Sequence, residues 1–210
     1  MLTEAGLPFY PVAGNHDLGI ELLKYRAYLE RPFLKLLPEE QTYGGGKLFY
    51  IVLDAGGVSM LLLALGWDAA RDADERNWVN DVLDRYADLP CIFMTHAYLA
   101  KPGMLLSYCR YLEETIVSAH PNIRLVLCRH MHGFFQDAHL YDDDGDGTPD
   151  RTVNVLMLDN QDALFLWRTL TFDPVARSIT VKTYAIGSEE AIGDDPDYGC
   201  PADFTLEHAF

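Results

Sequence analysis

Three short apolar segments of this chain end in histidine or asparagine, and this repeated ending constrains the fold more than any other feature. Each segment has the length and composition of a buried β-strand. The three strand ends therefore deliver imidazole or carboxamide groups, a pattern that core packing does not explain. Residues 9–13 lead into Gly-Asn-His-Asp at 14–17, residues 91–94 into Thr95-His96, and residues 124–128 into Arg-His-Met-His at 129–132.

The rest of the chain indicates an α/β fold. Helical and extended patterns alternate up to residue 128, and extended patterns follow one another from residue 134, which is typical of a layered α/β sandwich with mixed sheets. We expect one domain over 1–187 and an acidic carboxyl-terminal tail over 188–210. The patterns predict helices at 18–30, 72–86 and 106–120, strands at 48–53 and 58–65 joined by a hairpin turn, and further strands at 134–140, 152–158, 164–172, 178–184 and 204–206.

Composition excludes several classes of partner. The chain of 210 residues carries a formal net charge of −16 and is 49% hydrophobic. It can bury a sizeable core, but it lacks the basic surface with which proteins bind a nucleic-acid polymer. The longest apolar run, Val58–Leu65, is too short for a membrane span. A small phosphorylated substrate is compatible with the acidic charge, because bound metal cations reverse the local field. The oligomeric state is left open.

The strand-end residues form a candidate metal-binding set. Asn15, His96, His130 and His132 offer a carboxamide oxygen and neutral imidazole nitrogens, which suit zinc, manganese or iron. On a regular strand, His130 and His132 would share a face. Each could then bind a different ion of a close pair, or both could bind one ion. His16 is placed to protonate a departing oxygen as a general acid.

This ordered set resembles the calcineurin-like metallophosphoesterase family over most of the chain, from Phe9 to about Tyr184. The resemblance implies a layered α/β/β/α sandwich and hydrolysis of a phosphomonoester or phosphodiester by metal-activated water. It implies two divalent transition ions (Mn, Fe or Zn) in the complete domain. It also implies the following roles: Asn15, His96 and His130 on one metal, His132 on the other, and His16 as the catalytic acid.

The chain departs from the family pattern in two places. The family's opening motifs, Asp-x-His and Gly-Asp, do not occur before Gly14, so the sequence is either an amino-terminally truncated fragment or a relative that no longer catalyses. Arg129 stands where the family has glycine before His130, and its guanidinium could instead meet a substrate phosphate. The competing hypotheses are a non-catalytic calcium- or ligand-binding relative and a hydrolase with a single metal ion.

An acidic stretch at 142–150 resembles the first half of a calcium-binding loop. Asp142, Asp144, Asp146 and Asp150 take positions one, three, five and nine of such a loop, but position twelve is Val153 rather than glutamate. The alternative is an acidic hairpin turn favoured by Asp-Gly pairs. Calcium loops are commoner outside the cell, which favours a secreted or cell-envelope protein.

Overall fold

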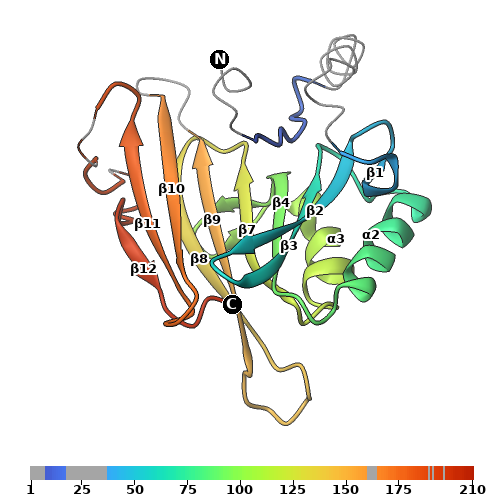
Figure 1. Ribbon diagram of the computed structural model, residues 1–210. Coiled ribbons are helices and arrows are strands. Elements are labelled where there is room, and N and C mark those ends of the chain that lie inside the picture. Colours follow the sequence, from blue (N-terminus) through green and yellow to red (C-terminus); the bar gives the residue numbers. More distant parts are fainter. Residues whose placement is uncertain (1–7, 18–36, 160–164, 189, 191, 196) are drawn as a thin grey trace.

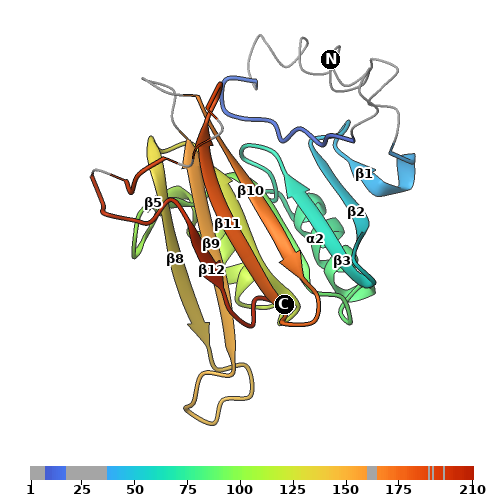
Figure 2. The ribbon, with the colours of Figure 1, turned by 60° about the vertical axis from the view of Figure 1, so that its left-hand side comes forward.

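The computed structural model describes residues 8–17, 37–159, 165–188, 190, 192–195 and 197–210. Two β-sheets packed face to face form its body, with helices against the outer face of the larger sheet (Figures 1 and 2). The seven-stranded sheet has the order β1 (Thr42–Tyr43), β2 (Leu48–Ala55), β3 (Val58–Leu65), β4 (Cys91–Ala97), β7 (Ile123–Arg129), β9 (Arg151–Asp159) and β8 (Gly133–Tyr141). The smaller sheet has the order β10 (Leu166–Asp173), β11 (Ser178–Ala185) and β12 (Phe204–Leu206).

Strand direction determines where the polar strand ends meet. The pairs β3–β4, β4–β7 and β7–β9 are parallel, whereas β1–β2, β2–β3 and β8–β9 are antiparallel. Four neighbouring strands therefore present their carboxyl ends at one edge of the large sheet. Ligand sites in open α/β sheets lie at such edges.

Alternating side chains of the large sheet divide between two hydrophobic cores. Leu48 and Tyr50 pack toward the helices, and Phe49 and Ile51 pack toward the smaller sheet. The two-residue alternation of a strand produces this division. The turn between β2 and β3 contains Gly56 and Gly57 with φ of 66° and 92°, which matches the predicted hairpin.

The helical layer differs from the sequence prediction in one place. Helix α2 spans Ala73–Arg85, and Asp72 caps it by accepting a hydrogen bond from the Glu75 amide. The helix predicted over 106–120 is present as an unbroken helical stretch that changes type along its length. It consists of a 3-10 turn (η2, Ser107–Cys109), a short α-helical turn (α3, Arg110–Leu112) and a π-helical turn (η3, Glu113–Val117), and it follows a β5–β6 hairpin (Leu99–Lys101 and Met104–Leu105). A further 3-10 turn, η1, spans Glu39–Gln41.

The predicted α/β sandwich is confirmed. Among the described residues, α-helices cover one face of the large sheet and the smaller sheet covers the other, which gives three of the four expected layers. The predicted helix at 18–30 lies outside the described residues. Strand β12 pairs with β11, and Ala209 and Phe210 pack into the core between the sheets. The domain boundary at residue 187 stays a prediction.

None of the described helices is long and apolar enough to cross a membrane.

Candidate metal centre

Four side chains gather where the parallel strands end. Trp67 follows β3, His96 lies near the end of β4, His130 follows β7, and Asp159 ends β9. The segment 8–17 passes over this same edge of the sheet (Figure 1). The main chain of Trp67 holds the segment there, because its amide donates to the Ala13 carbonyl at 2.7 Å.

The segment brings Asn15 against His96. The Oδ1 atom of Asn15 lies 2.9 Å from Nε2 of His96. Asp17 shapes the turn by accepting a hydrogen bond from the Gly14 amide at 2.7 Å. A Cβ atom at Gly14 would come within 2.8 Å of the His96 ring, so the backbone can approach the imidazole only with glycine at this position.

Aromatic packing holds the two histidine rings together. The ring centroids of His96 and His130 lie 5.2 Å apart. The Trp67 ring packs against both, with centroid distances of 5.6 Å to His96 and 4.9 Å to His130. Burial and the neighbouring His130 lower the pKa of His96 to about 4. Burial also lowers the pKa of His130. Both imidazoles are therefore neutral near pH 7, the state in which a histidine nitrogen can bind a metal.

The prediction that His130 and His132 share one strand face is wrong. β7 ends at Arg129 and β8 begins at Gly133, so both histidines lie in the connecting bend. His130 adopts φ of 84°, a left-handed conformation that turns the chain. The backbone of Arg129 is not left-handed. The position that the family fills with glycine is thus compatible with arginine, because the sharp turn falls one residue later.

Asp159 was missed by the sequence analysis. Its side chain is buried, accepts a hydrogen bond from the His130 amide at 3.2 Å, and pairs with the Arg129 guanidinium at 3.2 Å. Asp159 therefore positions Arg129, the last residue of β7, and His130, the first residue of the bend. The signal was present in the sequence, because Asp159 ends an apolar strand just as His96 does.

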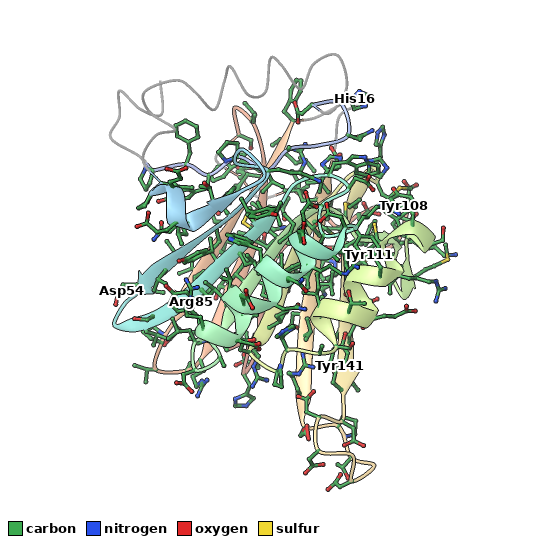
Figure 3. The ribbon with its side chains drawn as sticks, turned by 90° about the vertical axis from the view of Figure 1, so that its right-hand side faces the viewer. His16, Asp54, Arg85, Tyr108, Tyr111 and Tyr141 are labelled. Carbon is green, nitrogen blue, oxygen red and sulfur yellow. The ribbon has the colours of Figure 1, made fainter. Side chains whose placement is uncertain are left out.

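A cavity of about 450 Å³ unites the predicted residues. Asn15, His16, His96, His130 and His132 line it together with Arg129 and Asp159. His16 is exposed at the upper rim, on the same side as Tyr108 (Figure 3). The structure brings Asn15, His96 and His130 into mutual proximity, whereas His132 is exposed on the cavity wall. At this edge, no three described His, Cys, Asp or Glu side chains place ligand atoms within 4.8 Å of one another.

The acidic loop lies at the opposite end of the molecule, between β8 and β9 (Figure 1). One ligand oxygen from each of Asp142, Asp144 and Asp146 lies within 4.8 Å of the others, and all three side chains are exposed. Asp150 faces the same turn, because its carboxylate accepts from the amides of Asp143 and Asp144. The geometry is compatible with a cation, and calcium binding stays a prediction.

The structure is thus a sandwich of two sheets with amide and imidazole groups at the carboxyl ends of its parallel strands. Sequence comparison identifies the family. The family profile described as calcineurin-like phosphoesterase matches residues 1–134, and the chain belongs to this family, as predicted.

One similar curated protein is Bacillus subtilis (strain 168) "Uncharacterized protein YvnB". It is 29% identical over 215 residues, which cover 98% of this chain and 16% of that protein. The chain therefore spans about a sixth of this relative's length.

Proposed function

We propose that this domain is a metal-dependent phosphoesterase that hydrolyses a phosphomonoester or phosphodiester at the cavity beneath residues 14–17. Family membership supports a phosphoesterase activity. The observation that carries the metal dependence is the contact of Asn15 Oδ1 with His96 Nε2 at 2.9 Å beside the His130 ring. Three groups from three separate segments converge there although none needs the others for core packing.

The donor set fits a divalent transition ion. Two imidazoles with lowered pKa and one carboxamide oxygen are neutral ligands, and they suit manganese, iron or zinc. Asn15, His96 and His130 would hold one ion, and His132 would contribute to a second. Bound there, such ions would supply Lewis-acid activation of water and neutralise the charge of a phosphate.

The remaining residues divide the other tasks. His16 stands on the exposed rim of the cavity, where it would donate a proton to the leaving oxygen of the ester. Arg129 is 62% exposed and pairs with buried Asp159, so part of its guanidinium faces the cavity and would bind phosphate oxygens. Trp67 keeps water away from one side of the imidazoles.

Hydrolysis of p-nitrophenyl phosphate and bis(p-nitrophenyl) phosphate tests the proposal. We expect turnover that requires manganese, iron or zinc and that a chelator abolishes. The His16→Ala variant should lose turnover while it retains metal, because the rim histidine donates a proton and does not ligate. Loss of metal from this variant would show that His16 is a ligand instead.

His96→Ala should lose both metal and turnover, and His208→Asn serves as the control on an exposed histidine far from the cavity. Metal bound at the cavity without turnover of either ester would favour a non-catalytic relative of the fold. Neither metal nor turnover in the wild-type protein would contradict the proposal.

A further inference from the structure

A second cavity lies between the two sheets, next to the candidate metal centre. Its volume is about 350 Å³, within the range of small-molecule sites. Five leucine side chains of β7, β9 and β10 contribute to its lining. Phe165 and Ile186 complete it at the rim, where they are 71% and 69% exposed. The cavity is thus apolar inside and bordered by exposed apolar side chains.

The lining contains a half-buried cation, Arg168. Its Nε donates to Thr183 Oγ1 at 2.9 Å and its Nη1 to the Met157 carbonyl at 3.4 Å. Within the described part of the chain, no carboxylate forms an ion pair with Arg168, and burial lowers the pKa of its guanidinium to about 10. A guanidinium remains charged at that pKa. The site therefore holds a partly desolvated positive charge inside a protein of net charge −16, and such a charge favours an anion.

The two cavities adjoin each other. Arg129, Asp159, Leu127 and Cys128 line both of them. A molecule whose phosphate lies beside Arg129 would therefore need to reach past the Arg129–Asp159 pair to place its organic part between the sheets. Arg168 lines this second cavity. A negative group attached to the apolar part of such a molecule would therefore meet its guanidinium.

We propose that this second cavity binds the organic part of the substrate, and that it selects a phosphoester whose apolar aryl or alkyl group carries an additional acidic group for Arg168. The assignment of the cavity to the substrate rests on the proposed phosphoesterase function. The binding of an apolar anion in the cavity is independent of that function, because it requires neither metal nor turnover. Leucine side chains supply the apolar contact, and the guanidinium supplies the charge-assisted hydrogen bond.

Calorimetric titration with 2-naphthoate and its neutral counterpart 2-naphthamide tests the cavity directly. We expect the wild-type protein to bind naphthoate about tenfold more tightly than the amide, since only the carboxylate pairs with Arg168. Arg168→Met should remove this preference and Arg168→Lys should restore part of it. Arg110→Met, a change at an exposed arginine, is the matched control and should keep the full preference.

A change of cavity shape gives a second readout, should Arg168→Met fail to fold. Leu170→Trp fills the space between the sheets and should weaken both probes by a similar factor. Equal binding of the two probes by the wild-type protein would overturn the proposal, as would binding of neither. Retention of the preference in Arg168→Met would overturn it as well.

Kinetics then separate this proposal from the proposed function. For wild-type protein, 4-carboxyphenyl phosphate should have a lower KM than phenyl phosphate, and Arg168→Met should raise only the former KM. His96→Ala should abolish hydrolysis but leave naphthoate binding intact. Absence of hydrolysis with intact, Arg168-dependent naphthoate binding would contradict the phosphoesterase function alone. Equal KM values for the two esters in an active enzyme would contradict the substrate assignment.

Discussion

The Nε2 atom of His96 lies 2.9 Å from the Oδ1 atom of Asn15, although 81 positions separate the two residues in the chain. Asn15 belongs to the segment that crosses the sheet edge, and His96 belongs to a central parallel strand. Two polar groups of the proposed metal centre thus meet where the sheet opens to solvent. This contact links the fold to the proposed chemistry.

Gly14 permits this contact, so replacing it should disrupt the metal centre. In Gly14→Ala the new methyl group would stand 2.8 Å from the His96 ring and displace it, at a cost of about 1–3 kcal/mol. We expect at least about tenfold weaker zinc or manganese binding, measured by titration. Gly193→Ala is the control, since a Cβ there meets open space. Equal affinity in both variants would show that the approach of residues 14–15 to His96 does not matter for binding.

Stability should depend on pH through His139, which lies far from the cavity. Its ring pairs with Glu113 and Asp137, and the hydrogen bond with Glu113 is the main cause of its raised pKa. A group with a raised folded-state pKa stabilises the fold below its unfolded pKa, and that stability is lost as pH rises through the folded value. His139→Gln should therefore reduce the free energy of unfolding more at about pH 5.5 than at about pH 8.5.

Urea unfolding of both proteins at the two pH values measures this difference. The pKa of Glu113 is lowered, so Glu113 stays ionised at both values and does not obscure the effect. His208→Asn is the matched control, because His208 is exposed and has φ of 51°, which asparagine tolerates. An effect of His139→Gln that is equal at both pH values would exclude a charged His139–Glu113 pair.

Two neighbouring aspartates of the acidic loop should differ strongly in their contribution to stability. Asp143 forms two hydrogen bonds with Arg151, which is 3% exposed, whereas the carboxylate of Asp144 accepts a hydrogen bond from the Asp146 amide within the loop itself. Asp143→Ala would leave a buried guanidinium without its carboxylate, at a cost of about 3–5 kcal/mol. Asp144→Ala should cost less than about 0.5 kcal/mol in the absence of calcium. Similar losses on urea unfolding would mean that the Asp143–Arg151 pair is not maintained.

Calcium should stabilise the protein weakly through the same loop. Position twelve of the pattern is a valine, so we expect a dissociation constant of about 1 mM, typical of weak extracellular sites. About 10 mM calcium should then add about 1.4 kcal/mol to the free energy of unfolding. Asp146→Asn should remove this gain, and magnesium at the same concentration is the control. No change in the wild-type Tm with calcium would leave the loop as an acidic hairpin turn.

Much of the fold could be predicted because local patterns and packing agree. The strands around the Gly56–Gly57 turn, helix α2 and the apolar strands β4 and β7 were all predicted to within three residues at each end. In each case the two-residue or helical periodicity of the apolar side chains matches the face that is buried. The helix over 106–120 was predicted in place but not in type: residues 107–117 pass through 3-10, α- and π-helical turns, and within the π-helical turn Glu113 accepts hydrogen bonds from Tyr98 and Tyr141.

The candidate site was predicted less completely than the fold. Sequence motifs identified Asn15, His96 and His130, because histidine and asparagine at strand ends are conspicuous. Asp159 and Trp67 were missed, since an aspartate before a turn and a tryptophan after a strand are common for other reasons. Their importance depends on strand order: β3 and β9 run parallel to β4 and β7, and only this arrangement places their ends beside the histidines.

The most direct test is an anomalous-scattering experiment on crystals loaded with zinc or manganese. We expect a peak in the cavity within coordination distance of Asn15, His96 and His130, and loss of that peak in His96→Ala crystals. A map that shows metal only at Asp142, Asp144 and Asp146, or no metal at all, would contradict this expectation.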